Sequence, residues 1–189
     1  MSSSIADAVG NGPLKRLLNL WCRESLAHGG IPPRSAFAPE ILGPYLLPCM
    51  FIYERRREAD GRVRFFCRVA GGNLRAAFRQ EGTGRYLDEL IPPDWLENRV
   101  RIFSRCVDGG LPLLMTGHLV AEGVEWRPYR RLLTPVRAQD GDVQLLGGIV
   151  FPRHGEEQGG RPCPPPGGKV LVTAATPEDI AALAAASPD

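Results

Sequence analysis

The spacing of hydrophobic residues changes from helical to alternating as the chain proceeds. Between Pro13 and Gly29, apolar residues recur three or four positions apart, which predicts an amphipathic helix with one apolar stripe. Gly29 and Gly30 favour an end to that helix, because glycine readily adopts the left-handed C-cap conformation. After a proline-rich connector, strand-like runs over 50–57 and 62–70 flank Asp60-Gly61, a dipeptide typical of hairpin turns.

The rest of the pattern predicts helices followed by further strands. Short helices are expected over 73–78 and 86–91, and a longer one from Asp94 to Gly109-Gly110. Three strands are then expected over 111–121, 126–137 and 143–151. This order predicts an α+β fold with a five-stranded antiparallel sheet, short helices on one face and the N-terminal amphipathic helix.

Glycine and proline content divides the chain into three parts. Residues 1–12 are small and polar and predict a flexible tail, and 13–152 form the predicted domain. Residues 153–189 are expected to hold a Pro/Gly-rich linker and a short C-terminal helix with Thr176 as its cap. The pattern over 169–173 also fits a short additional strand.

Composition is that of an ordinary globular domain, with 43% hydrophobic and 23% charged residues. No apolar run approaches the roughly 20 residues that a transmembrane helix needs, and the N-terminus lacks a signal-peptide pattern, so we expect no membrane span and a cytoplasmic location. A net charge of +2 makes nucleic acid an unfavourable partner. The arginine clusters over 55–57 and 127–131 are interpreted as solvated charges near strand ends.

The chain shows no recognisable constellation of catalytic or metal-binding residues. Its five cysteines are scattered and never spaced as a C-x-x-C pair, which argues against a zinc site and a disulfide framework. The first four are interpreted as buried small hydrophobic residues. No nucleophile motif is present, and the neighbouring Asp88 and Glu89 would point apart on a helix. We therefore expect no enzymatic activity and no metal.

Two stretches carry a resemblance to a known family. The segment 68–78 runs Arg-Val-Ala-Gly-Gly-Asn-Leu-Arg-Ala-Ala-Phe, and Gly-Thr-Gly-Arg-Tyr-Leu-Asp-Glu-Leu follows over 82–90. Together they resemble the core of a Per-Arnt-Sim (PAS) domain. The whole span 14–151 is similar to a bacterial family of stand-alone PAS-like proteins, with Trp21 in the leading helix and a Leu-Leu-x-Pro-Val strand over 132–136.

The resemblance implies a sensory module with a ligand cavity between the sheet and the short helices. Leu87 occupies the position of the reactive Cys in flavin-photochemical relatives, so a light-driven flavin adduct is not expected. The long helix lacks the axial His of haem-binding relatives, and the cofactor stays unknown. The cavity is expected to be lined by residues from strands and helices alike: Phe66, Arg68, Leu74, Phe78, Leu90, Phe103, His118 and Leu133.

These observations leave three functional hypotheses. The first is a ligand-binding PAS module that signals through a separate effector protein. Its N-terminal helix would pack on a second copy, to form a homodimer, or on the outer face of its own sheet. The second is a structural dimerisation module whose apolar residues simply fill the core, and the third is an enzyme on the same scaffold. Arg68 favours a ligand, because an inward guanidinium would need a carboxylate partner or an anionic ligand.

Overall fold

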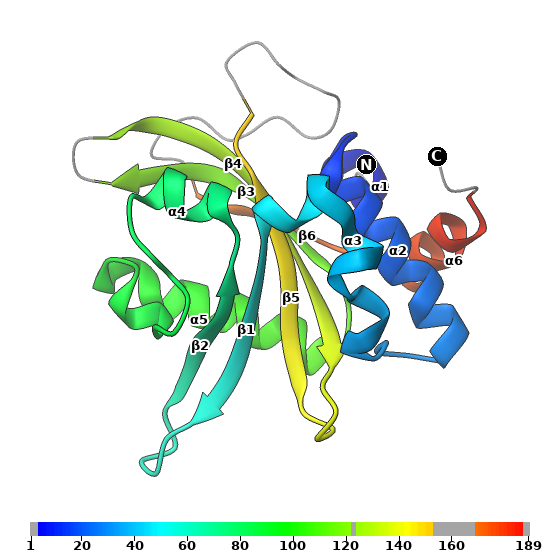
Figure 1. Ribbon diagram of the computed structural model, residues 1–189, viewed down its shortest axis with the longest axis horizontal. Helices are drawn as coiled ribbons and strands as arrows, with labels where there is room; N and C mark the ends of the chain where they lie inside the picture. Colours follow the sequence, from blue (N-terminus) through cyan, green and yellow to red (C-terminus); the bar gives the residue numbers. More distant parts are fainter. Residues whose placement is uncertain (1–3, 122–123, 153–168, 187–189) are drawn as a thin grey trace.

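A computed structural model describes residues 4–121, 124–152 and 169–186, without the side chains of 120–126. Its centre is a twisted antiparallel sheet of six strands in the order β2-β1-β5-β4-β3-β6 (Figure 1). The strands are β1 (Met50–Arg57), β2 (Val63–Ala70), β3 (Leu113–Ala121), β4 (Val124–Arg137), β5 (Val143–Val150) and β6 (Leu171–Ala174).

The predicted hairpins are confirmed, and the predicted strand number is wrong by one. Gly61 and Gly141 have φ angles of 84° and 93°, which explains why an Asp-Gly pair serves each turn. The sixth strand, β6, pairs antiparallel with β3 from Leu113↔Ala174 to Thr116↔Leu171. A four-residue strand gives too short an alternation to count firmly on sequence alone.

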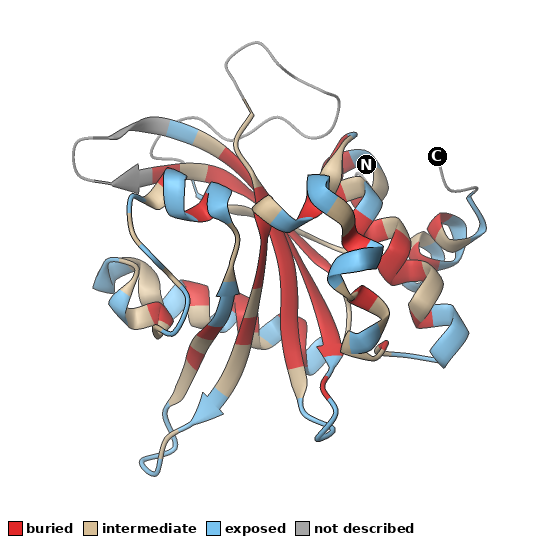
Figure 2. Ribbon diagram, viewed as in Figure 1, coloured by how far each residue is buried: buried red, intermediate tan, exposed pale blue. Residues whose placement is uncertain are grey.

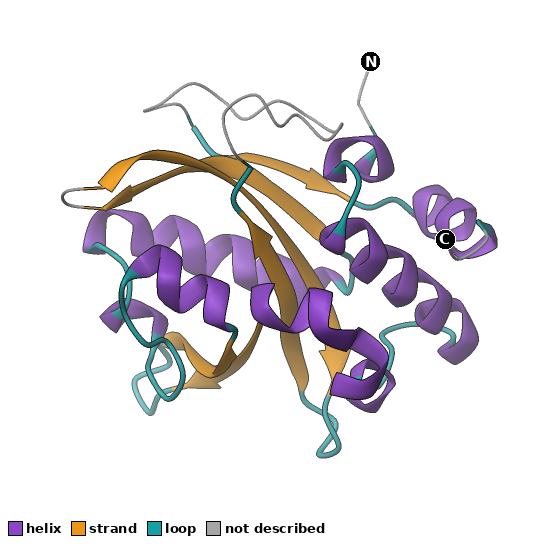
Figure 3. Cartoon of the chain, turned by 45° about the horizontal axis from the view of Figure 1, so that its top comes forward, coloured by secondary structure: helices purple, strands orange, loops and turns teal. Residues whose placement is uncertain are grey.

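Helices cover both faces of the sheet (Figures 1 and 3). On one face lie α4 (Gly72–Phe78), the short helix η3 (Leu87–Glu89) and α5 (Pro93–Gly109). The buried residues of this side form one apolar cluster that includes Phe65, Phe103 and Leu133. Burial is deepest along the central strands, as Figure 2 shows. The predicted end of the long helix is confirmed, since Gly110 is its left-handed C-cap.

The opposite face is covered by the two ends of the chain. Here lie α1 (Ile5–Val9), α2 (Pro13–His28), α3 (Pro39–Leu46) and α6 (Pro177–Ala185), with two short helices, η1 (Arg34–Phe37) and η2 (Leu47–Cys49). The apolar stripe of α2 packs on the sheet, and the Nε1 atom of Trp21 donates a 2.7 Å hydrogen bond to the Pro135 carbonyl oxygen. The predicted amphipathic helix is thus confirmed, and its stripe is used within its own chain.

The ends of the chain depart from the predicted division. Ser4 caps α1, and Ile5 and Ala8 are fully buried, so the predicted flexible tail over 1–12 is wrong for residues 5–9. The helix was missed because five residues give too short a pattern. The predicted C-terminal helix is confirmed, with Thr176 as its cap. The predicted linker over 153–168 lies outside the described residues.

Two adjacent glycines in β5 allow both layers to approach the sheet closely. A Cβ atom on Gly147 would lie 2.4 Å from Cζ of Phe51, and one on Gly148 would lie 2.8 Å from Cδ2 of Leu14. Because successive strand residues face opposite sides, each glycine serves one layer. In the described part of the chain, no helix has both the length and the apolarity to span a bilayer.

Candidate ligand pocket

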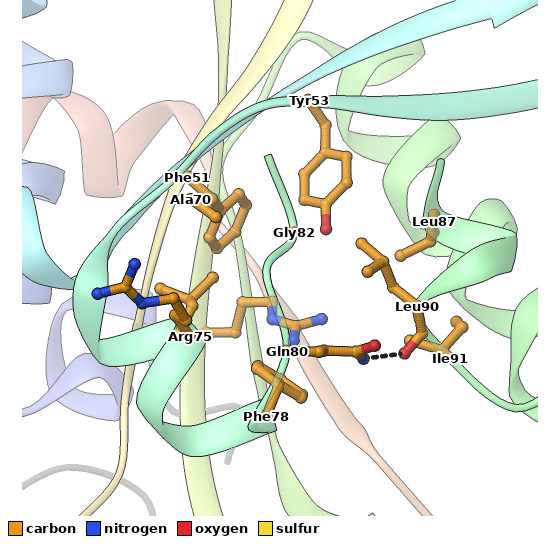
Figure 4. Close-up of a pocket in the computed structure, with 12 residues that line it drawn as sticks. Phe51, Tyr53, Ala70, Arg75, Phe78, Gln80, Gly82, Leu87, Leu90 and Ile91 are labelled. Carbon is orange, nitrogen blue, oxygen red and sulfur yellow. Dashed lines mark hydrogen bonds between the residues drawn. The ribbon is translucent and has the colours of Figure 1, made fainter. Parts of the chain in front are cut away.

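A small pocket lies between the sheet, α4 and the segment 80–91 (Figure 4). Its volume is about 50 Å³, room for a few water-sized groups, and one side is open to solvent. The lining is mostly apolar: Phe51, Tyr53, Ala70, Leu74, Arg75, Phe78, Gln80, Gly82, Leu87, Leu90, Ile91 and Arg131. An apolar recess with a few polar groups is the usual form of a small-molecule site.

The sheet supplies the aromatic wall of the pocket. Phe51 and Tyr53 lie two residues apart on β1, and their rings meet edge to face at 5.6 Å. Gly147 makes space for the Phe51 ring, as described above. Burial raises the pKa of the Tyr53 phenol, so this hydroxyl stays protonated at neutral pH. Figure 4 shows that hydroxyl pointing toward the pocket interior.

Helix α4 forms a second wall with Leu74 and Phe78. The helix starts close to η2 because Gly71 has no side chain: a Cβ atom there would lie 2.4 Å from the carbonyl oxygen of Pro48. Arg75 stands at the rim, with Nη1 3.8 Å from a Glu81 carboxylate oxygen. Figure 4 shows its guanidinium directed away from the other lining residues.

The segment 80–91 closes the third side and is fastened to β2 through its Thr-Gly-Arg-x-Leu motif. The Gly84 amide donates to the Cys67 carbonyl oxygen at 2.8 Å, and the Cys67 amide donates to the Arg85 carbonyl oxygen at 2.9 Å. The Gln80 side chain donates a 2.8 Å hydrogen bond to the Leu90 carbonyl oxygen, which ties the two ends of the segment together (Figure 4). The motif therefore positions Leu87 and Leu90 in the pocket.

One charged side chain reaches the pocket from the centre of the sheet. Arg131 on β4 is only 8% exposed, and its Nε atom has no hydrogen-bond partner among the described residues. Its guanidinium lies 5.4 Å from the ring centre of Tyr129 and 5.8 Å from that of Phe51. Burial, together with the nearby positive charge of Arg99, lowers the pKa of Arg131 to about 10. Arg131 therefore remains a cation at neutral pH.

Five of the eight residues predicted to line the cavity lie on the pocket side of the sheet. Leu74, Phe78 and Leu90 line the pocket itself. Phe103 and Leu133 are fully buried in the adjoining apolar cluster and do not reach the pocket. Phe103 supports the site indirectly, since its ring centre lies 5.5 Å from that of Tyr53.

The structure places the other three predicted residues elsewhere. Phe65 and Cys67 are the inward residues of β2, so Phe66 and Arg68 point the other way. Phe66 stacks against Tyr86, and Arg68 is half exposed. The prediction that Arg68 points inward is therefore wrong, because its partner is Glu54 at 2.8 Å.

His118 also lies off the pocket. On β3 the residues Leu113, Met115 and Leu119 belong to the pocket-side cluster, so His118 faces the other layer. The pocket thus includes predicted residues of the helical wall, and the residues predicted from β2, as well as His118, lie away from it.

The residues that were missed include the buried arginines Arg99 and Arg131. The cluster 127–131 was interpreted as solvated, yet Arg130 and Arg131 are 5% and 8% exposed. A signal was available in the sequence, because Leu133 was predicted to point inward and Arg131 lies two residues earlier on the same strand. Phe51 and Tyr53 were missed as well, although they lie two residues apart on β1 and so face the same side of the sheet.

The four cysteines in the described residues are free and buried, as predicted. Burial raises the pKa of Cys22 to about 12 and those of Cys49 and Cys67 to about 11, so these thiols are poor nucleophiles at neutral pH. Cys163 lies outside the described residues. Within 4–121, 124–152 and 169–186, no three His, Cys, Asp or Glu side chains are grouped to hold a metal ion.

The fold and pocket define a small α+β domain, with an antiparallel sheet that holds a recess under short helices. The chain belongs to the PAS domain family, whose profile matches residues 11–151. PAS domains are sensory and signalling modules and are generally not catalytic.

Other comparisons add little to this assignment. A solved structure of an RNA-binding light-oxygen-voltage receptor is similar at 20% identity and a TM-score of 0.32, over 55% of this chain and 29% of that one. The comparison with curated proteins gives no match.

Proposed function

We propose that this PAS domain binds a small molecule in the pocket between the sheet, α4 and the segment 80–91, and that it signals through a separate effector protein. The observation that supports this most is the apolar, partly open recess that contains the buried cation of Arg131. A domain selected only for stability would gain by filling such a space with apolar side chains.

The pocket walls offer a route from ligand to surface. Leu74 and Phe78 lie on the inner side of α4, while Gly72, Asn73 and Arg75 of the same helix are exposed. The opposite wall is closed at its ends by the Gln80 to Leu90 hydrogen bond. A ligand that pushes α4 or this segment outward would change a surface that an effector can contact.

The alternative of a structural dimerisation module has less support. The sequence predicted a homodimer through the N-terminal helix, but Leu17, Leu18 and Trp21 of α2 are fully buried within the chain itself. A homodimer would therefore need another surface. A filled core is also at odds with the recess beside Tyr53.

The proposal is tested by a fragment screen on the wild-type chain and two tryptophan variants. Leu74→Trp would fill the pocket, whereas Leu26→Trp adds the same side chain at a position that is 57% exposed. Small apolar fragments should raise the melting temperature of the wild type and Leu26→Trp, and should lose this effect in Leu74→Trp. Equal responses in both variants, or no binder for the wild type, would contradict the proposal.

A further inference from the structure

Two buried guanidinium groups, one of which lines the pocket, have no carboxylate partner among the described residues. Arg99 on α5 is 7% exposed and Arg131 on β4 is 8% exposed. The hydrogen bonds of Arg99 are long ones, to the Sδ atom of Met115 at 3.6 Å and to the Tyr129 hydroxyl at 3.5 Å. Among the described residues, no acidic side chain forms an ion pair with either arginine.

This arrangement differs from that of the partly buried arginines on β2, which have carboxylate partners. Arg64, for example, lies 2.9 Å from an Asp88 oxygen, and Arg68 lies 2.8 Å from Glu54. An isolated buried charge costs several kcal/mol in general, and two like charges add mutual repulsion. The lowered pKa of Arg131 reflects that burial and repulsion.

Contacts with aromatic rings compensate only in part. The Tyr129 ring lies 5.4 Å from the Arg131 guanidinium and 5.9 Å from that of Arg99. These cation-π contacts attract the charge but accept no N–H hydrogen bond in the plane of the guanidinium. The Nε atom of Arg131 is still without a protein acceptor in the described part of the chain.

We infer that the ligand of this pocket carries a carboxylate that pairs with Arg131, and that an apolar body follows it toward the open side. This inference rests on the proposed function and names the class of ligand. A planar guanidinium fork matches a carboxylate in two parallel hydrogen bonds, and Arg99 adds to the local positive potential. The Tyr53 hydroxyl, which points toward the pocket interior (Figure 4), adds a polar group beside this position.

The pocket walls determine the chemistry of the ligand beyond its carboxylate. The enclosed volume of about 50 Å³ holds a carboxylate and little more. The remaining lining, with Leu74, Phe78, Leu90 and Ile91, is apolar and would desolvate a short hydrocarbon chain. A fully hydrated inorganic anion gains nothing from those walls, so a short-chain monocarboxylate fits better than phosphate.

Calorimetric titration of the full chain with three probes tests this inference. The probes are hexanoate, its neutral counterpart hexanamide, and inorganic phosphate. The protein variants are wild type, Arg131→Gln and the control Arg68→Gln, which removes an arginine from outside the pocket. Hexanoate should bind the wild type about tenfold or more tightly than hexanamide, because charge-assisted hydrogen bonds are the strong ones. Arg131→Gln should abolish that preference, and Arg68→Gln should keep it.

Different outcomes would contradict the carboxylate ligand and the proposed ligand-binding function. If hexanoate and hexanamide bind the wild type equally, the carboxylate inference falls while the pocket keeps its ligand-binding role. Phosphate binding as tight as hexanoate would overturn the apolar part of the inference. If no probe binds and fragments also fail in the screen described above, the proposed function itself fails. Should Arg131→Gln not fold, the comparison of the two probes on the wild type still decides.

Discussion

The guanidinium groups of Arg131 on β4 and Arg99 on α5 lie 5.4 Å and 5.9 Å from the ring centre of Tyr129, and burial, together with the charge of Arg99, lowers the pKa of Arg131 to about 10. Two buried cations on facing elements are an unusual use of the interior of a small domain. We expect these charges to lower the stability of the ligand-free protein and to favour the binding of an anion. Substitutions of Arg131 measure both effects.

Replacing Arg131 with methionine should stabilise the ligand-free protein. Methionine fills a similar volume, makes no demand for an acceptor and removes the repulsion from Arg99. We expect the free energy of unfolding to rise by about 1–4 kcal/mol, the range seen when buried charges are replaced by apolar residues. Urea denaturation measures it, with Arg68→Met as the control that should change stability by about 0.5 kcal/mol or less. A clear loss of stability in Arg131→Met would show that the cation is balanced within the chain.

A side chain at Gly147 should disturb the aromatic wall of the pocket. In Gly147→Ala the new Cβ atom would overlap Cζ of Phe51 and the Leu132 carbonyl oxygen, which lies 2.5 Å away. Because the backbone atom cannot move freely, we expect a loss of about 1–3 kcal/mol in the free energy of unfolding. Gly72→Ala is the matched control, since nothing lies within 4 Å of its Cβ position. Equal stabilities of the two variants would contradict this account of β5.

The hydrogen bond from Trp21 to Pro135 should contribute to the attachment of α2. Trp21→Phe keeps an aromatic ring but removes the buried donor, and we expect a cost of about 1–3 kcal/mol. Trp95→Phe is the comparison, because Trp95 is half-buried and forms no hydrogen bond through its indole among the described contacts. Thermal unfolding of both variants would test the difference. A Trp95→Phe cost as large as that of Trp21→Phe would argue against a special role for this bond.

The contribution of Glu54 to the stability of the protein should depend on pH. Burial alone would raise its pKa, but hydrogen bonds from Arg68 and Arg56 lower it overall. A carboxylate with a lowered folded-state pKa stabilises the protein above its unfolded pKa, and that stability is lost as pH falls through the folded-state value.

Glu54→Gln should therefore cost about 1 kcal/mol in unfolding free energy at pH 7, the scale of a partly exposed ion pair, and less at pH 3, where more of the carboxylate is protonated. Denaturation curves at both pH values, with the exposed Glu97→Gln as control, measure the effect. A cost that stays the same at both pH values would assign the role of Glu54 to packing.

The order of elements was readable from the sequence because long periodic segments and Asp-Gly turns leave strong local signals. The strands β1 to β5, the helices α2 and α5, and both hairpin turns follow from such signals. Helix α1 and strand β6 did not, because five and four residues carry too little periodicity. Their burial depends on contacts with distant parts of the chain.

The site was only partly readable for a related reason. Leu74, Phe78 and Leu90 were found because helices under a sheet present their apolar residues to it. Phe66 and Arg68 were misplaced because their face of β2 was expected to point inward, whereas Phe65 and Cys67 are the buried residues. A register shift opposite Ile52 and Tyr53 then changes the alternation at the end of β2, so that Ala70 turns into the pocket. Such a bulge leaves no clear local signal. Arg131 was missed because charge was given more weight than strand alternation.

The central claim is that the space beside Arg131 binds a small carboxylate, and nitrogen-15 NMR of the full chain tests it most directly. The Nε–H signal of Arg131 can be assigned by its loss in Arg131→Gln. On addition of hexanoate, this signal and the backbone amides of Leu74, Phe78 and Leu90 should shift together in a saturable manner, and hexanamide should leave the Nε–H signal in place. If hexanoate shifts none of these signals, or shifts only those of exposed arginines such as Arg68, the account is contradicted.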